Sequence, residues 1–273
     1  MLKNRLRKTL IQIGYHTRPD FIIAGAQKAG TTGLYKILEN HSQVCSALTK
    51  EVQFFNRDDL YKTLGNHYYH QQFPLPHHLQ KGQLLFEATP EYLYHPEVAK
   101  RIHQYNPAIK IIIMLRDPAY RALSAWNMLH YKFKNHPEYF YLHDPRSFKE
   151  AIYSDLNTIK ITNWYTNQIS YVKRGIYYPQ IQEYLKYFPS ENILIVENTE
   201  LLANLNQVLK KVTRFLNIAD EKLEMQKANQ GHKLSETEFE EEISCLKEFY
   251  HPYNEKLFAL LNRRFDWQTP VCN

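Results

Sequence analysis

Short, uninterrupted apolar runs alternate with amphipathic segments along most of the chain, and this alternation constrains the fold more than any other feature. The runs cover residues 20–25, 84–87, 110–116 and 192–196. Their continuity is typical of parallel strands that are buried on both faces, since half-exposed strands alternate apolar with polar residues. The pattern therefore predicts an α/β fold, a parallel sheet with helices on both faces.

The length of 273 residues suits one large domain better than two. We expect a basic, solvated leader over residues 1–19 and a single domain over residues 20–273. No stretch reaches the roughly 20 apolar residues that span a bilayer, so we expect no transmembrane segment. Helices are predicted over residues 178–187, 206–216 and 254–262, with a polar loop leading into a further helix between residues 226 and 242.

The net charge of +6 and the pI near 9.0 favour an anionic partner. The basic residues are spread along the chain instead of forming one arm or stripe, which argues against nucleic acid as that partner. The three cysteines, Cys45, Cys245 and Cys272, are odd in number and far apart. They form neither a disulfide framework nor a metal-ligand spacing, so we expect a cytoplasmic protein and no metal site.

The first apolar run leads into a glycine-containing turn that opens a predicted helix. Such a turn directs several backbone N–H groups and the positive end of the helix dipole at one point, which favours a phosphate or sulfate group. Gly30 allows close approach of the backbone, Lys28 supplies a mobile charge, and the hydroxyls of Thr31 and Thr32 donate hydrogen bonds. No lysine stands directly before Thr31, so the order differs from the nucleotide-triphosphatase loop. A tight turn that binds nothing is the alternative interpretation.

A second anion site is predicted where the strongest apolar run ends. Arg116 is the last residue of that run, at the strand end where ligands collect in open α/β sheets. Its planar guanidinium group can bind two phosphate oxygens. Ser124 lies about two turns into the helix that Pro118 can begin. A local salt bridge between Arg116 and Asp117 is the alternative.

Together these two motifs resemble those of the sulfotransferases that use 3′-phosphoadenosine 5′-phosphosulfate (PAPS), specifically the carbohydrate branch with the heparan sulfate enzymes and their bacterial relatives. The resemblance extends over roughly residues 20–267 and implies a P-loop-like, nucleotide-binding fold. It implies that Lys28 acts at the oxygen between phosphorus and sulfur, and that Arg116 and Ser124 bind the 3′-phosphate. The residues expected to hold the 5′-phosphosulfate are Gln27, Lys28, Ala29, Gly30, Thr31 and Thr32.

Four weaker matches complete the resemblance, at residues 50–56, at 87–92, at 175–178 with Gln180, and at 253–257 with 265–267 near the end of the chain. Residues 50–56 resemble the segment with the catalytic glutamate, which makes Glu51 the expected general base; a surface carboxylate paired with Lys50 is the alternative. Residues 87–92 resemble a segment that contacts cofactor and acceptor, although Ala88 replaces a lysine common there. By the same resemblance, we expect Gln53, Asn56 and Glu87 to contact the acceptor, and Tyr177, His232 and Lys233 to contact the cofactor.

The expected activity is transfer of a sulfuryl group from PAPS to a hydroxyl, or to an amine or amide nitrogen, of a glycan or small natural product. Gln53 and Asn56 follow the pattern of the N-sulfating branch, yet a hydroxyl served by Glu51 is the commoner chemistry, so we expect oxygen as the acceptor atom. Two alternatives stay open: a P-loop kinase of a small metabolite, and an inactive polyanion-binding protein on the same fold.

Overall fold

In a computed structural model, the protein forms two compact units, and the structure describes residues 2–159, 164–166, 169–225 and 234–267. Unit 1 comprises Met1–Ala26, Gly30–Leu115 and Tyr184–Lys227. Unit 2 comprises Gln27–Ala29, Arg116–Glu183 and Ala228–Asn273. Each unit is therefore assembled from alternating stretches of the chain, and the expectation of one domain over residues 20–273 stays a prediction.

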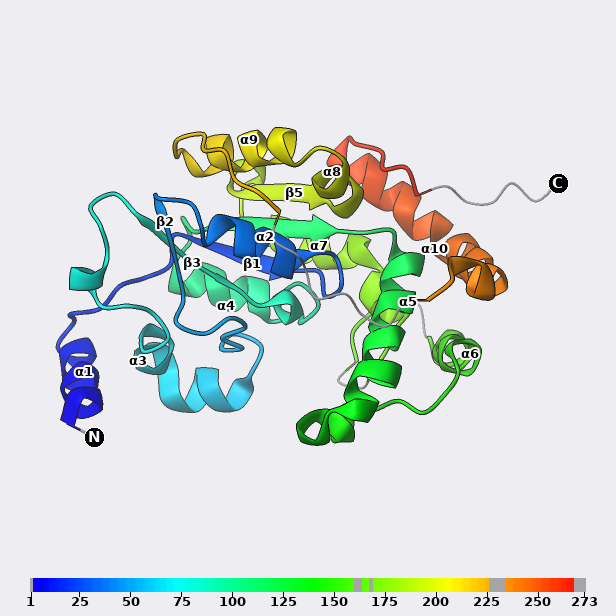
Figure 1. The fold of residues 1–273 in the computed structure, drawn as a ribbon, viewed down its shortest axis with the longest axis horizontal. Coiled ribbons are helices and arrows are strands. Elements are labelled where there is room, and N and C mark those ends of the chain that lie inside the picture. Colours follow the sequence, from blue (N-terminus) through cyan, green and yellow to red (C-terminus); the bar gives the residue numbers. More distant parts are fainter. Residues whose placement is uncertain (1, 160–163, 167–168, 226–233, 268–273) are drawn as a thin grey trace. The chain divides into compact units, whose positions relative to one another are not determined.

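Unit 1 is built on a five-stranded sheet with the order β2-β3-β1-β4-β5, in which every neighbouring pair is parallel. The β4 and β5 arrows run side by side in the same direction in Figure 1. This confirms the predicted parallel sheet, and the four predicted strands agree with the observed ones to within one residue at each end. The strands are β1 (Phe21–Gly25), β2 (Val44–Ser46), β3 (Leu84–Ala88), β4 (Lys110–Leu115) and β5 (Ile193–Glu197).

Continuous apolar sequence makes the central strands the interior of unit 1. All five residues of β1 are buried, as are the last five of β4, which is the burial expected of a sheet covered on both faces. β2 was not predicted, because three residues at a sheet edge are too few to form a recognisable apolar run.

The helices of unit 1 pack an apolar face inward. In α9, Val208, Val212 and Leu216 recur every four residues and are buried, as an amphipathic helix requires. The unit contains α1 (Leu2–Gln12), α2 (Thr31–Leu38), α3 (Gly65–His70), α4 (Val98–Tyr105), α8 (Asn198–Ala203) and α9 (Leu205–Leu216).

The leader expected over residues 1–19 begins with a helix, in which most of the described side chains are exposed. Residues Leu2–Gln12 form α1, whose Ile11 side chain is buried and whose Arg7 Nη2 donates to the carbonyl oxygen of Phe73 at 2.5 Å. Burial of an apolar side chain and one long-range hydrogen bond fix this segment against unit 1. In the described part of the chain no helix is long and apolar enough to cross a membrane.

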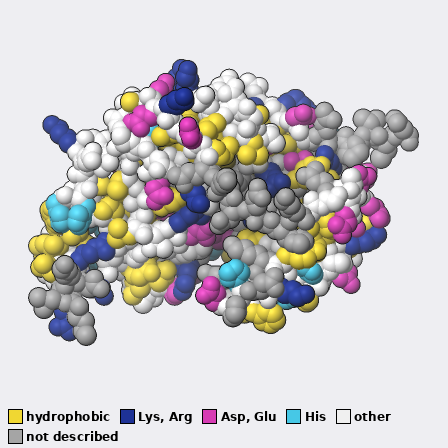
Figure 2. All heavy atoms as spheres, in the orientation of Figure 1, with side chains coloured by type: hydrophobic (Ala, Val, Ile, Leu, Met, Phe, Trp, Pro, Cys, Tyr) yellow, Lys and Arg dark blue, Asp and Glu magenta, His cyan; other side chains and the backbone are white. Residues whose placement is uncertain are grey.

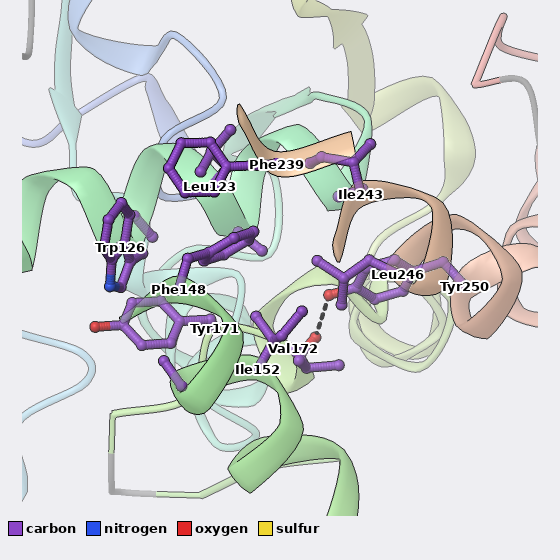
Figure 3. Packing of buried hydrophobic residues seen from close by; sticks show 14 of the residues in the cluster. Leu123, Trp126, Phe148, Ile152, Tyr171, Val172, Phe239, Ile243, Leu246 and Tyr250 are labelled. Carbon is purple, nitrogen blue, oxygen red and sulfur yellow. Dashed lines mark hydrogen bonds between the residues drawn. The ribbon is translucent and has the colours of Figure 1, made fainter. Parts of the chain in front are cut away.

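Unit 2 is helical and has its own apolar core. Its helices are α5 (Pro118–Asn127), α6 (Phe148–Thr158), α10 (Glu240–Leu261) and most of α7 (Tyr177–Tyr187), whose last turn belongs to unit 1. Figure 3 shows side chains of α5, α6 and α10 packed together, with the Tyr250 hydroxyl donating to the Val172 carbonyl oxygen at 2.8 Å. Three acidic residues in its first turn favour the start of α10.

One predicted boundary in unit 2 is wrong. We expected a last helix beginning near residue 254, after a separate helix, but α10 continues without a break from Glu240 to Leu261 and contains Pro252. Proline removes only one backbone hydrogen bond, and burial of residues on both sides of it, including Leu246, Tyr250 and Leu257, outweighs that loss.

Candidate functional site

The loop between β1 and α2 begins at the carboxyl edge of the sheet. The Ala26 N–H donates to the Met114 carbonyl oxygen at 2.7 Å, which ties the end of β1 to β4. Gly25 lies so close to Leu93 that a Cβ atom at this position would approach the Leu93 Cβ to 2.5 Å. Only glycine fits between these neighbours, so the sequence fixes where the loop leaves the sheet.

Two left-handed residues shape the rest of this loop. Lys28 has φ 69° and Gly30 has φ 95°, and α2 starts at Thr31 directly after them. Gly30, the N-cap residue of α2, has no side chain with which to cap the first turn. An uncapped helix N-terminus presents N–H groups that have no acceptor within the helix, and these favour an anionic ligand.

Gly30 also lies too close to a neighbouring side chain to carry one of its own. A Cβ atom at Gly30 would collide with the side-chain amide of Asn198, at the start of α8. Any other residue at position 30 would therefore require the Asn198 side chain to move. Sequence reasoning missed Asn198, which carries no motif of its own.

Lys28 belongs to unit 2 and is half-buried. Its Nζ atom lies 3.8 Å from the Met128 sulfur, just beyond the end of α5. Thioether sulfur is a weak acceptor, so this contact orients the lysine without neutralising its charge. A half-buried lysine in this loop is suited to contact an anionic group.

The loop after β4 is shaped by Asp117 and Tyr177, both in unit 2. The Asp117 carboxylate caps α5 by accepting from the Ala119 N–H at 2.9 Å. Burial raises the pKa of Asp117, while the Ala119 N–H and the charge of Lys247, 3.7 Å away, act against that rise. The charge of Arg116 also acts against the rise, so the alternative of a local Arg116–Asp117 salt bridge stays open.

Tyr177 contributes to the same loop from a buried position. Its hydroxyl donates to the Arg116 carbonyl oxygen at 2.9 Å, and its side chain is 1% exposed. The predicted contact of Tyr177 with the cofactor is thus less favoured than an indirect role in fixing the backbone of Arg116. Ser124 is half-buried on α5, two turns after Arg116, as the sequence predicts.

The segment with the predicted general base lies in unit 1. Glu51 has φ 63° and Gln53 has φ 56°, and the Lys50 Nζ atom contacts the Glu51 Oε1 atom at 2.7 Å. This pair is the alternative interpretation of Glu51, and the geometry is compatible with both roles because nearly half of the Glu51 side chain is exposed. Asn56 Nδ2 donates to Gln53 Oε1 at 2.6 Å, so these two predicted acceptor residues do meet. Asn56 Oδ1 is buried and has no partner among the described residues.

Glu87 differs most from its predicted role. The side chain lies near the carboxyl end of β3, is completely buried, and accepts hydrogen bonds from three hydroxyl groups. Burial raises the pKa of Glu87 to about 7, although the hydrogen bonds lower it. A carboxylate enclosed in this way does not favour the predicted direct contact with an acceptor. The hydroxyl donors are Tyr69 at 2.6 Å, Thr89 at 2.7 Å and Tyr92 at 3.0 Å.

The predicted residues are distributed over both units, and two lie outside the described residues. Unit 1 holds Gly30, Thr31, Thr32, Glu51, Gln53, Asn56 and Glu87, while unit 2 holds Gln27, Lys28, Ala29, Arg116, Ser124 and Tyr177. His232 and Lys233 lie outside the described residues. Among the described histidine, cysteine, aspartate and glutamate side chains, no group of three could hold a metal ion.

A parallel sheet whose carboxyl edge carries a glycine loop opening a helix defines a P-loop-like α/β protein suited to bind phosphate or sulfate groups. A family model described as "Sulfotransferase domain" matches residues 18–256. A crystal structure of a sulfotransferase from Alicyclobacillus acidocaldarius superposes with a TM-score of 0.70 at 26% identity, covering 92% of this chain and 99% of that chain. The chain belongs to the sulfotransferase family.

Two curated relatives define the branch. Heparan sulfate glucosamine 3-O-sulfotransferase 5 of Mus musculus is 27% identical over 271 residues, covering 91% of this chain and 74% of that protein. Bifunctional heparan sulfate N-deacetylase/N-sulfotransferase 4 of Mus musculus is 31% identical over 210 residues, covering 73% of this chain but only 22% of that protein. The resemblance drawn from the sequence is confirmed, and so are the class of enzyme and PAPS as the sulfuryl donor.

Proposed function

We propose that this sulfotransferase transfers the sulfuryl group of PAPS to a hydroxyl group of a glycan or small natural product, with Lys28 and Glu51 as catalytic residues. The loop between β1 and α2 is the observation that carries the proposal. It combines a helix start at a left-handed glycine, a glycine whose added Cβ would collide with Asn198, and a half-buried lysine two residues before the helix start. These are the groups that an anionic sulfuryl donor requires.

The residues of the two loops fit PAPS. Gln27, Ala29 and the helix start at Gly30 would hold the 5′-phosphosulfate through backbone N–H groups, with Thr31 and Thr32 adding hydroxyl donors. When bound, PAPS supplies the sulfuryl group: the bond from sulfur to the 5′-phosphate oxygen breaks, the bond from sulfur to the acceptor oxygen forms, and the desulfated product PAP keeps the electron pair.

Lys28 and Glu51 have complementary roles in this proposal. Lys28 offsets the negative charge that develops on the 5′-phosphate oxygen as it leaves. In transfers with a loose transition state, such charge stabilisation contributes most to lowering the activation barrier. Glu51 accepts the proton that the acceptor hydroxyl loses. Both residues have positive φ angles, so each side chain is presented from a constrained backbone.

Arg116 and Ser124 would bind the 3′-phosphate, Arg116 with two N–H groups and Ser124 with its hydroxyl. The hydrogen bond from Tyr177 to the Arg116 carbonyl supports this, because it fixes the backbone from which the guanidinium group extends. Contacts of His232 and Lys233 with the nucleotide stay a prediction.

The acceptor atom follows from Glu51, Gln53 and Asn56. The 2.6 Å hydrogen bond between Gln53 and Asn56 joins two neutral amides, which can orient an acceptor but cannot take its proton. Glu51 is then the base for a hydroxyl acceptor. An amine would have to arrive uncharged to be sulfated here, so we expect oxygen over nitrogen.

The test is transfer from ³⁵S-labelled PAPS to heparosan, a polysaccharide of alternating uronic acid and N-acetylglucosamine, and to N-deacetylated heparosan, with small phenols and alcohols as further acceptors. We expect an acid-stable O-sulfate that the Glu51→Gln variant fails to form. An acid-labile product made only from N-deacetylated heparosan would contradict oxygen as the acceptor atom.

The same assay separates the alternatives. An inactive polyanion-binding protein would bind PAP and leave every acceptor unmodified. A kinase would transfer phosphate from ATP to one of the small acceptors, which the loop does not favour because no lysine stands directly before Thr31.

We also propose a cytoplasmic location. Cys45 and Cys245 are free thiols and half-buried, which suits a reducing compartment. Alkylation of the protein isolated from its host should label both residues without prior reduction, and a disulfide at either would contradict the proposal.

A further inference from the structure

The segment from Glu51 to Phe55 is held to the end of β3 by a series of hydrogen bonds. Four of its five N–H groups donate to acceptors between Ala88 and Tyr92. The acceptors are the Ala88 carbonyl oxygen for Glu51 (3.1 Å), Thr89 Oγ1 for Gln53 (3.3 Å), and the Tyr92 hydroxyl for Phe54 (3.0 Å) and Phe55 (3.4 Å).

The buried carboxylate decides which way two of these hydroxyls point. A hydroxyl group has one proton to donate, and both Thr89 and Tyr92 donate theirs to Glu87. Their oxygen lone pairs are therefore left to accept the N–H groups of residues 53–55. Above its pKa of about 7, Glu87 is a carboxylate that can only accept, so it sets the direction of its hydrogen bonds with these two hydroxyls.

The backbone of the segment requires such support. Glu51 and Gln53 both lie in the left-handed region, with φ 63° and 56°, which is unfavourable for residues with a Cβ atom. Residues held in this region persist where the surrounding structure fixes them. The hydrogen bonds to the end of β3 are the contacts that fix these two.

We propose that Glu87 is a positioning residue: through the hydroxyls of Thr89 and Tyr92 it holds residues 51–55 in the conformation that presents Glu51 and Gln53. Glu87 acts through these hydroxyls and does not touch the acceptor. The inference rests on the proposed role of Glu51 as general base, and extends the machinery for that role into the core of unit 1.

The chain contains a matched pair of tyrosines for testing this. Tyr69 and Tyr92 are both fully buried and both donate to Glu87 Oε1. The Tyr92 hydroxyl also accepts backbone N–H groups of the segment. Tyr69 contacts the segment through its ring, which stacks on Phe54 with centroids 4.8 Å apart. A change to phenylalanine keeps either ring, so the two variants lose the same bond to Glu87 and differ in the bonds to the segment.

The experiment compares Tyr92→Phe with Tyr69→Phe in the full chain. Amide hydrogen exchange of residues 51–55 should accelerate about tenfold in Tyr92→Phe and far less in Tyr69→Phe, as expected for loss of one or two hydrogen bonds. The kcat for transfer from PAPS to heparosan should fall about tenfold in Tyr92→Phe, while PAP affinity, measured by calorimetry, should stay within about twofold because the nucleotide contacts lie elsewhere.

The outcomes separate this inference from the proposed function. Equal exchange of residues 51–55 in the two variants would overturn the positioning role, whatever the activity. Faster exchange in Tyr92→Phe with unchanged kcat would uphold the structural link and contradict Glu51 as the base. The Glu87→Gln variant gives a second measurement, because its amide nitrogen donates where a carboxylate oxygen accepts. Faster exchange of residues 51–55 in this variant would support the positioning role of Glu87, and unchanged exchange would overturn it.

Discussion

Lys28, Glu51 and Gln53 share a left-handed backbone conformation, with φ angles between 56° and 69°. Among the described residues two other non-glycine side chains have positive φ, Asn217 and Asn262, and each ends a helix, where asparagine commonly adopts this conformation. Lys28, Glu51 and Gln53 do not end a helix, so secondary structure does not explain their left-handed conformation. Backbone strain of this kind concentrates at functional positions, so the three residues are set apart by geometry as well as by sequence.

Lys28→Ala should lower kcat by about 10²–10³-fold, since removing one well-placed charge from a transition state costs about 3–4 kcal/mol. Alanine and lysine both carry a Cβ atom, so the left-handed backbone is no more strained in the variant than in the parent. Transfer from PAPS to heparosan measures the effect, and circular dichroism checks the fold. Lys149→Ala, which removes an exposed lysine of unit 2 paired with Glu241, is the control. Near-normal kcat in Lys28→Ala would remove this lysine from the mechanism.

Glu87 should make unit 1 less stable as the pH rises. Burial raises the pKa of its carboxyl from 4.5 to about 7, so the folded protein binds this proton more tightly than the unfolded chain does. The free energy of unfolding must then fall between pH 4.5 and 7, by at most about 3 kcal/mol at 1.36 kcal/mol per pKa unit. The pKa values of the neighbouring Tyr69, Tyr92, Tyr105 and Tyr184 are all raised, so these groups stay neutral throughout.

Urea unfolding followed by circular dichroism at pH 5, 6, 7 and 8 would measure this dependence. Because glutamine does not titrate, the difference in unfolding free energy between the parent and Glu87→Gln isolates the contribution of Glu87 from that of other buried carboxyls. Parallel pH profiles for the two proteins would contradict the raised pKa.

At the scale of elements, the sequence predicts what depends on local pattern. β1 and β4 are continuous apolar runs, and the loops after them carry their motifs at fixed positions, so both strands and both loops were found. The network around Glu87 could not be found in this way. Tyr69 reaches it from α3, and nothing local distinguishes that residue among 21 tyrosines. The helix break expected before residue 254 was wrong, because packing along α10 keeps one continuous helix through Pro252.

Replacing either of two glycines in the α2 region by alanine should have opposite effects on stability. Gly30→Ala places a Cβ atom at φ 95° and against Asn198, so it should destabilise the protein by more than about 1–2 kcal/mol, the cost of the left-handed conformation alone, and abolish PAP binding. Gly33 lies inside α2 with no atom within 4 Å of the added Cβ, so Gly33→Ala should stabilise by about 0.5–1 kcal/mol and leave binding intact. Urea unfolding and calorimetric titration with PAP would test both, and equal effects of the two changes would contradict the special role of Gly30.

At the scale of the whole molecule, basic and acidic side chains are mixed over the visible surface (Figure 2). Figure 2 shows lysine and arginine side chains interspersed with aspartate and glutamate over the visible face, so the charge of +6 is not gathered into one patch there. Affinity for an anionic nucleotide must then come from specific groups such as those proposed here. All three tryptophans, Trp126, Trp164 and Trp267, belong to unit 2, which gives that unit its own fluorescence signal.

PAP should therefore raise the unfolding temperature seen both by tryptophan fluorescence and by far-ultraviolet circular dichroism, which also reports the strands of unit 1. A ligand that binds only the folded state adds about 2.7 kcal/mol at a concentration of 100 Kd. AMP lacks the 3′-phosphate that Arg116 and Ser124 are proposed to bind, so at equal concentration it should stabilise much less. Ser124→Ala should narrow the difference between PAP and AMP, because the lost hydroxyl serves only the 3′-phosphate. Equal shifts with PAP and AMP in the parent protein would remove Arg116 and Ser124 from the nucleotide site, while leaving the loop before α2 as the binder of the 5′-phosphate.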